Sequence, residues 1–242
     1  MALNRRDFLK NGTAGLAVTG ASFLFPMELL AAMRKKVGPN DTINIGLIGC
    51  KGMGFSDLTS ILKMGDTNVI ALCDVDETVL QSRTLDLEKA GIKKPTWYTD
   101  YRLLLENKDI DVVVIGTPDH WHCLQLIDAL QAGKDVYCEK PIANSIQEAN
   151  IMLNYVESSD RMVQIGQWQR SQPHFVDAIN YVHSGKLGEI RLAKAWAYQG
   201  WMKPVPIIAD TAVPKGVDYN MRLGPAAKRG FNQNRFDVNF RW

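Results

Sequence analysis

Short apolar runs alternate with helical patterns from residue 43 to about residue 165, and this alternation restricts the fold more than any other feature of the chain. A short, continuously apolar run is typical of a strand that is buried on both faces of a parallel sheet. We therefore predict an α/β fold with a doubly wound parallel sheet and right-handed crossovers. The predicted strands are Ile43–Ile48, Val69–Cys73, Val112–Ile115, Val136–Cys138 and Met162–Ile165.

Helical patterns lie between these strands, and local signals mark some of their ends. Ser145 and Glu148 form a capping box at the start of one helix, and Gly91 and Gly133 lie where two others should end. The predicted helices are Leu58–Met64, Glu77–Ala90, Tyr101–Leu105, His122–Ala132 and Ile146–Val156.

The pattern changes after residue 165. Pro173 is expected to begin a connecting helix that ends at Gly185, and the alternation over Ile190–Tyr198 predicts a strand packed on one face. The next forty or so residues are rich in Pro, Asn, Arg and aromatics and show no periodicity, which is unusual inside a complete domain. We expect residues 166–242 to hold the incomplete start of an α+β, open-sheet substrate domain, and the chain to be the N-terminal part of a larger enzyme.

A glycine-rich loop follows the first predicted strand and resembles a dinucleotide-binding fingerprint. In such loops the first glycine permits a tight turn, the second lets backbone approach the pyrophosphate, and the third lets the helix pack closely. Gly49 and Gly54 fit the first and third places, whereas Lys51 occupies the second. Either Gly52 provides the close approach or the Lys51 ammonium pairs with phosphate, and Met53 completes the candidate loop. An ordinary βα turn without cofactor remains an alternative.

Asp74 directly follows the second predicted strand, about 25 residues after Gly49, near the place of a ribose-binding acid in a Rossmann domain. Its carboxylate would accept hydrogen bonds from both ribose hydroxyls and repel a 2′-phosphate. No arginine follows it directly. The sequence therefore favours NAD over NADP, in a Rossmann domain spanning residues 41–165.

Two further motifs follow predicted strands, at the sheet edge where open α/β sheets bind ligands. Thr117–His122 has the sequence TPDHWH, and Glu139–Pro141 has the sequence EKP. A histidine at a helix start is more often a capping or packing residue, and a Glu-Lys pair is usually solvated. Their joint placement at neighbouring strand ends favours a functional site.

These two motifs and the glycine loop resemble the Gfo/Idh/MocA oxidoreductase family, in its secreted twin-arginine branch. The resemblance extends over Gly166–Arg170, Gly185–Ile190, Arg222–Ala226 and Phe231–Phe236. It implies a catalytic role for Lys140 and His122. It also implies that cofactor contacts come from the glycine loop and Asp74 together with Thr117, Pro118, His120, Glu139, Lys140, Gln167 and Arg170.

The resemblance implies NAD-dependent hydride transfer from the carbinol of a sugar or sugar derivative. Lys140 would lie beside the nicotinamide and relay the hydroxyl proton. Two alternatives remain open: an NAD-dependent glycosidase of the same fold, which oxidises, eliminates and recycles its cofactor, and a non-catalytic nucleotide-binding fragment. Lys51 in place of the middle glycine and Arg222, where relatives commonly have an aromatic residue, depart from the family pattern.

The first residues resemble a twin-arginine export signal. Arg5, Arg6 and Lys10 precede a mildly apolar stretch, residues 12–25, that is shorter than the ~20 residues of a spanning helix. We expect residues 1–32 to be a signal read by the twin-arginine machinery. The protein would then be periplasmic, or tethered to the membrane if the signal is not cleaved. Because this route carries folded proteins, the cofactor would be loaded in the cytoplasm and held tightly.

Charge and cysteine content narrow the partners. The net charge is +2 without blocks of one sign, which suggests no nucleic-acid partner. The four cysteines are widely spaced, and Cys50, Cys73 and Cys138 end apolar runs, as small buried hydrophobes do. The cysteine spacing therefore predicts no metal site. The resemblance implies a small-molecule sugar substrate and a homo-oligomer in the full-length form.

Overall fold

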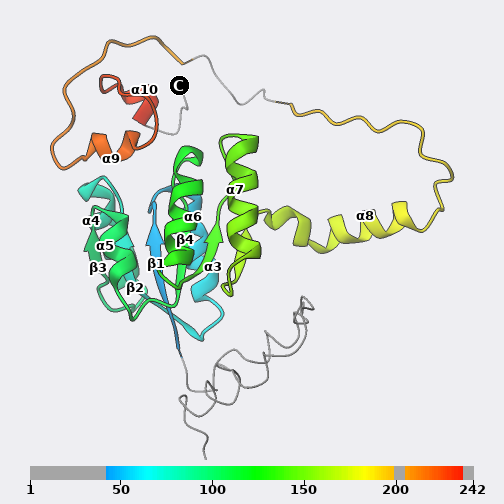
Figure 1. Cartoon of the computed structure of the whole chain (residues 1–242), viewed down its shortest axis with the longest axis horizontal. Coiled ribbons are helices and arrows are strands. Elements are labelled where there is room, and N and C mark those ends of the chain that lie inside the picture. The colour runs from blue at the N-terminus through cyan, green and yellow to red at the C-terminus, as the bar shows by residue number, and fades with distance from the viewer. Residues whose placement is uncertain (1–41, 199–204, 237–242) are drawn as a thin grey trace, which may run out of the picture. The chain divides into compact units, whose positions relative to one another are not determined.

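The computed structural model describes residues 42–198 and 205–236 (Figure 1). The proposed export signal, Trp201 and the last six residues lie outside the described residues. Within the described part, no helix combines the length and the apolar character needed to cross a membrane.

A six-stranded parallel sheet in the order β3-β2-β1-β4-β5-β6 forms the centre of the fold. This order confirms the predicted doubly wound α/β sheet, because the chain moves outward from β1 in one direction and then returns to add β4 on its other side. The strands are β1 (Ile43–Ile48), β2 (Thr67–Cys73), β3 (Thr96–Tyr98), β4 (Val112–Ile115), β5 (Asp135–Cys138) and β6 (Val163–Ile165).

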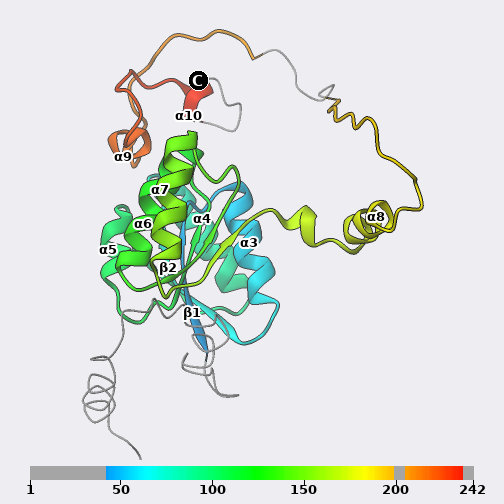
Figure 2. The ribbon, with the colours of Figure 1, turned by 45° about the vertical axis from the view of Figure 1, so that its right-hand side comes forward.

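Helices cover both faces of the sheet (Figures 1 and 2). One core cluster packs α3 and α4 against the sheet through Leu58 and Leu80, and the other packs α5, α6 and α7 through Leu104, Leu126 and Met152. These helices are α3 (Gly52–Leu62), α4 (Glu77–Lys89), α5 (Tyr101–Glu106), α6 (His122–Gln131) and α7 (Ile146–Glu157). Strands with helices on both faces can be apolar throughout, which explains the continuous runs in the sequence.

The local signals at helix ends are largely confirmed. Gly91 and Gly133 adopt positive φ angles of 79° and 76° just after α4 and α6. The Glu148 amide donates to the Ser145 hydroxyl over 3.2 Å, as a capping box requires. The Glu148 carboxylate, however, accepts from the Asn144 amide at 2.9 Å rather than from Ser145.

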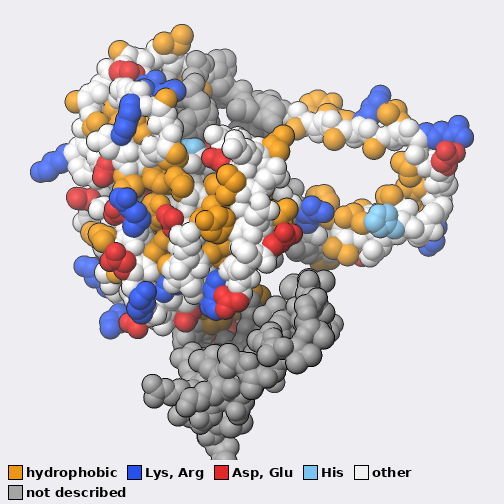
Figure 3. Space-filling view, in the orientation of Figure 1, with side chains coloured by type: hydrophobic (Ala, Val, Ile, Leu, Met, Phe, Trp, Pro, Cys, Tyr) orange, Lys and Arg blue, Asp and Glu red, His pale blue; other side chains and the backbone are white. Residues whose placement is uncertain are grey.

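The prediction for residues 190–198 is wrong, because these residues form no strand in the structure. They follow α8 (Pro173–His183), and their apolar side chains are exposed, with Leu192 73% and Trp196 72% accessible. Figure 3 shows these apolar side chains along the surface of the segment. An alternating pattern forms a strand only when a neighbouring strand completes its hydrogen bonds. The described structure supplies no such neighbour.

Five elements of the described structure were not predicted, among them two short 3-10 helices, η1 (Asp119–Trp121) and η2 (Trp168–Ser171). Strand β3 is a three-residue edge strand, too short and too exposed for its pattern to stand out. The helices α9 (Tyr219–Leu223) and α10 (Gln233–Phe236) lie in the stretch without periodicity. Helix α3 also begins six residues earlier than predicted, at Gly52 rather than Leu58. Its first turn is part of the glycine loop.

Candidate cofactor site

A cavity of about 1000 Å³ opens at the carboxyl ends of β1, β2, β4 and β5. This edge of a doubly wound sheet is where ligands bind. Of the residues proposed from sequence, those that line the cavity are Gly49, Lys51, Gly52, Met53, Asp74, Thr117, Pro118, Glu139 and Lys140.

Three glycines interlock at the base of this cavity. Gly49 has a φ of 86°, and a β-carbon there would lie 2.6 Å from the Thr117 amide nitrogen. A β-carbon on Gly54 would overlap the Gly49 carbonyl oxygen, and one on Gly116 would overlap the Gly54 α-carbon. Gly49 and Gly54 therefore fill the turn and packing places predicted for them. The sequence analysis gave Gly116 no role, although its place directly after β4 was a usable signal.

The start of α3 points an uncapped set of amides at the cavity edge. Lys51 is the N-cap residue and its side chain forms no cap hydrogen bond. Gly52 adopts a φ of 47°, with no atom within 4 Å of where a β-carbon would stand. The space above Gly52 and the exposed amides suit a phosphate group.

The Lys51 ammonium lies toward the β2 end of the site. Its Nζ is 3.7 Å from Oδ2 of Asp76 and 5.1 Å from the centre of the Phe236 ring. The side chain is 52% exposed, so this ion pair contributes little stability. Both alternatives for the second glycine place have geometric support: Gly52 leaves room, and Lys51 brings a cation.

Asp74 joins the end of β2 to the glycine loop. Its Oδ2 accepts from the Cys50 amide at 2.8 Å, and its Oδ1 accepts from the Asp76 amide at 3.1 Å. Burial raises the pKa of this carboxyl, while these two amides act in the opposite direction. A carboxylate has about four acceptor positions, so two remain for a ligand.

His122 does not lie where the sequence analysis placed it. The ring is 1% exposed, with Nδ1 2.7 Å from the Pro141 carbonyl oxygen and Nε2 2.8 Å from the Thr117 carbonyl oxygen. Because backbone oxygens occupy both nitrogens, the ring joins the two motifs and presents no nitrogen to a substrate. This geometry favours a positioning role for His122, and its catalytic role stays a prediction.

His120 also turns away from the cavity. It is buried, and its Nε2 lies 3.1 Å from the Arg222 carbonyl oxygen. Burial lowers the pKa of this imidazole. Gln167 and Arg170 are exposed and contact each other over 3.4 Å, outside the residues that line the cavity. Since the described structure has nothing packed on that side, these two residues form no part of the cavity wall here.

The EKP motif contributes one buried acid and one exposed base. Glu139 is 4% exposed, and its Oε1 has no hydrogen-bond partner among the described residues. Asp57 of α3 also has a buried oxygen, Oδ2, without a hydrogen-bond partner among the described residues. Burial together with the Glu139 charge raises the pKa of Asp57 to about 6. Lys140 is exposed at the cavity wall. The sequence analysis missed Asp57, which only the packing of α3 brings to the motif.

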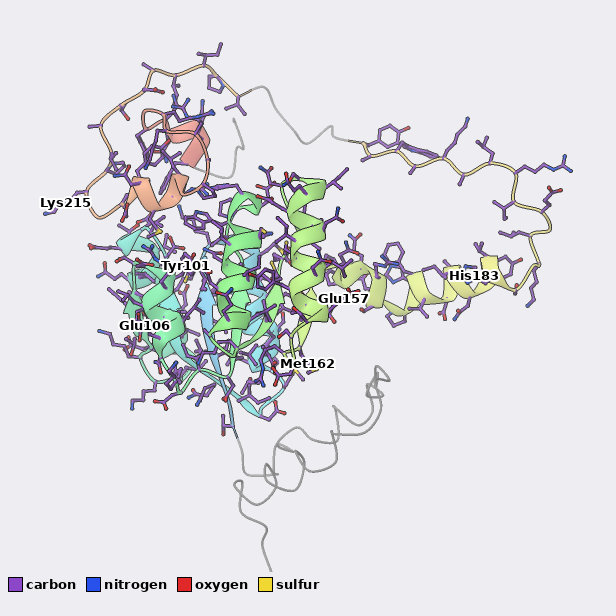
Figure 4. The ribbon with its side chains drawn as sticks, viewed as in Figure 1. Tyr101, Glu106, Glu157, Met162, His183 and Lys215 are labelled. Atoms are coloured by element: carbon purple, nitrogen blue, oxygen red, sulfur yellow. The ribbon has the colours of Figure 1, made fainter. Side chains whose placement is uncertain are left out.

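A segment distant in sequence completes the cavity wall with Met221, Arg222 and Phe236. The Asp218 amide donates to the Val75 carbonyl at 2.8 Å, and the Trp121 indole donates to the Met221 carbonyl at 3.0 Å. This segment is thus fixed to the loops after both β2 and β4. Tyr101, which is labelled in Figure 4, lies at the start of α5 and also lines the cavity.

The described residues contain no cluster of three or more His, Cys, Asp or Glu side chains arranged for a metal ion. The four cysteines are free and buried, as expected of small hydrophobic side chains.

The sheet order, the interlocked glycines, the uncapped α3 amides and the buried Asp74 together define a dinucleotide-binding domain of the Rossmann class. The chain belongs to the Gfo/Idh/MocA oxidoreductase family with an NAD-binding Rossmann fold, whose model matches residues 43–167.

Known proteins with a similar sequence or structure carry this fold. A glycosyl hydrolase family 109 protein from Shewanella pealeana is 30% identical over 209 residues, covering 78% of this chain and 45% of that protein. An NAD-binding oxidoreductase from Klebsiella pneumoniae is 29% identical, with a TM-score of 0.52 over 61% of this chain and 40% of that one. A levoglucosan dehydrogenase, in complex with NADH and levoglucosan, is 25% identical with a TM-score of 0.54, covering 61% and 41%. The chain thus spans less than half the length of these relatives.

Proposed function

We propose that this chain is the cofactor-binding part of an NAD-dependent oxidoreductase that acts on a sugar or sugar derivative. The observation that carries the proposal is the shared cavity: the α3 amides, Asp74 and the exposed Lys140 border one space. This arrangement fits an extended dinucleotide, with phosphates at α3, a ribose at Asp74 and the nicotinamide toward Lys140. Residues 41–165 would form the NAD domain, and residues 166–242 would begin the substrate domain.

Bound NAD would supply the hydride acceptor. The chain's own residues orient it: Asp74 accepts from ribose hydroxyls, and the glycine loop lets the pyrophosphate approach the backbone. At the other end, the Lys140 side chain borders the space for the substrate carbinol. In its neutral amine form, Nζ would take up the hydroxyl proton as the hydride leaves, and the ammonium so formed would stabilise negative charge on the oxygen. His122 holds the Thr117 and Pro141 loops at a fixed separation around this point.

An NAD-dependent glycosidase is the second candidate, favoured by the glycosyl hydrolase family 109 relative. Oxidation at a sugar carbon would acidify the neighbouring C–H, elimination would break the glycosidic bond, and the hydride would return. A cofactor regenerated in each cycle suits an exported protein. A nucleotide-binding module without turnover is the third candidate.

One set of assays separates these candidates. The chain is titrated with NAD by calorimetry and then tested on a sugar panel for reduced-cofactor absorbance and for aryl-glycoside release. Net NADH formation indicates a dehydrogenase, aryl release without net NADH indicates a glycosidase, and binding without either indicates a binding module. Any turnover should disappear in Lys140→Ala and persist in Lys108→Ala, an exposed lysine away from the cavity. A chain that does not bind NAD contradicts the proposal.

We also propose export by the twin-arginine route with cofactor already bound. Arg5 and Arg6, followed by Lys10, support it. Changing Arg5 and Arg6 together to Lys should keep the protein in the cytoplasm, since the paired arginines are what the machinery reads. Cell fractionation measures this, with Arg34→Lys as the control. Unchanged appearance of the double variant outside the cytoplasm would contradict the proposal.

A further inference from the structure

Arg222 places a buried cation at the wall of the cofactor cavity. Its guanidinium forms no ion pair with any described carboxylate, and Nη1 is buried without a hydrogen-bond partner among the described residues. Nη2 has a single long contact, 3.4 Å to the Phe236 carbonyl oxygen. Burial lowers the pKa of Arg222, and the charges of Asp74 and Asp119 act in the opposite direction without pairing with it directly. A largely buried guanidinium without a direct ion pair is costly, so a protein retains one where a ligand can supply the pairing charge.

The surroundings indicate what that partner is. The Phe236 ring is near two cations, with Lys51 Nζ 5.1 Å and the Arg222 guanidinium carbon 5.8 Å from its centre. Lys51 is the N-cap residue of α3, but its side chain forms no cap hydrogen bond, so the first amides of the helix stay available to a ligand in the cavity. Arg222 is thus brought from a distant part of the chain to the phosphate end of the proposed dinucleotide site.

The backbone around Arg222 is fixed independently of its side chain. The Met221 and Arg222 carbonyl oxygens accept from the Trp121 indole, and the Arg222 carbonyl also contacts Nε2 of His120. Gly224 packs so closely on Trp121 that a β-carbon there would overlap the indole ring. These contacts fix the backbone at Arg222, so its side chain can be changed without removing them.

We propose that Arg222 is a cofactor-binding residue that pairs with the pyrophosphate shared by NAD and NADP. The planar guanidinium matches two phosphate oxygens at once, which a lysine ammonium cannot do. Phosphate oxygens in the cavity would provide the directly paired anion that the Arg222 guanidinium does not have among the described residues. This inference rests on the proposed NAD-binding function and adds to it a phosphate ligand from outside the residues matched by the family model, 43–167.

The test compares Arg222→Met with the unchanged chain by calorimetric titration of NAD, ADP and adenosine. Loss of a charge-assisted contact should weaken NAD and ADP by about ten- to hundredfold and leave adenosine unchanged. Arg222→Lys should recover part of the affinity. The control, Arg191→Met, removes an exposed arginine that is 81% accessible and should change nothing.

The outcomes are separable. NAD and ADP affinities of Arg222→Met within twofold of the unchanged chain overturn the inference. An equal loss of affinity for adenosine does the same. Far-ultraviolet circular dichroism checks that each variant is folded, and the comparison rests on Arg222→Lys if the methionine variant is not. Absence of NAD binding by the unchanged chain would instead contradict the proposed function itself.

Discussion

The backbone amide of Cys50 donates a 2.8 Å hydrogen bond to Oδ2 of Asp74, which ties the glycine loop to the end of β2. The carboxylate therefore has two tasks: it fixes the loop that faces the phosphates, and it keeps acceptor positions for the ribose. A substitution there should be judged on both stability and nucleotide choice.

Asp74→Asn should reduce the ratio of NAD to NADP affinity by about tenfold or more. The carboxylate charge repels a 2′-phosphate and strengthens hydrogen bonds from the ribose hydroxyls, and the substitution removes both effects. The amide oxygen can still accept from the Cys50 amide, so the loop should persist, although the hydrogen bond from the Asp76 amide is lost. Calorimetric titration with both nucleotides measures the change. Asp109→Asn, an exposed aspartate away from the cavity, is the control. Equal affinities of the unchanged chain for NAD and NADP would refute the role of Asp74.

His122→Ala should lower the free energy of unfolding by about 1–3 kcal/mol, since the neutral ring donates to one of the Thr117 and Pro141 carbonyls and its removal takes away that hydrogen bond and the packing of a buried ring. The affinity for NAD should also fall, because the His122 ring no longer links the Thr117 and Pro141 loops. Urea denaturation measures the stability. His183→Ala, at the exposed end of α8, should change it by less than about 0.5 kcal/mol. If the two variants are equally stable, His122 does not stabilise the contact between the two loops.

The Asp57–Glu139 pair should make stability depend on pH. Burial and the Glu139 charge raise the pKa of Asp57 from 3.8 to about 6 in the folded chain. The folded state then holds this proton more tightly than the unfolded state, so stability should fall as pH rises through that interval. Asp57→Asn should flatten this part of the profile, whereas Asp109→Asn should retain it. Urea denaturation across this pH interval is the measurement, and parallel profiles for the unchanged chain and Asp57→Asn would contradict the coupling.

Gly116→Ala should weaken NAD binding and destabilise the fold by about 1–3 kcal/mol, because its β-carbon would overlap the Gly54 α-carbon. Gly65→Ala is a matched control. It has open space around it but a φ of 87°, so it should cost about 1–2 kcal/mol of stability and leave NAD affinity unchanged. Calorimetry and denaturation together separate the two effects. An unaltered NAD affinity in Gly116→Ala would show that the glycine contact does not shape the site.

Features that depend on neighbours along the chain could be predicted from the amino-acid sequence. The apolar runs predicted five of the six strands, and Gly91 and Gly133 marked helix ends because a positive φ is a local requirement. Asp74 and Lys140 were found at the cavity because strand ends in a parallel sheet meet at one edge.

Contacts between residues far apart in the chain required the folded structure. His122 looked catalytic in its motif, yet two backbone carbonyls lie against its ring nitrogens. Asp57 comes near Glu139 only because α3 packs on the sheet, and Arg222 reaches Phe236 and the cavity through contacts of a segment without periodicity. The prediction of a strand at residues 190–198 was wrong for the same reason. An alternating pattern predicts which face of a strand would be buried, but the neighbouring strand that it needs comes only from the folded chain.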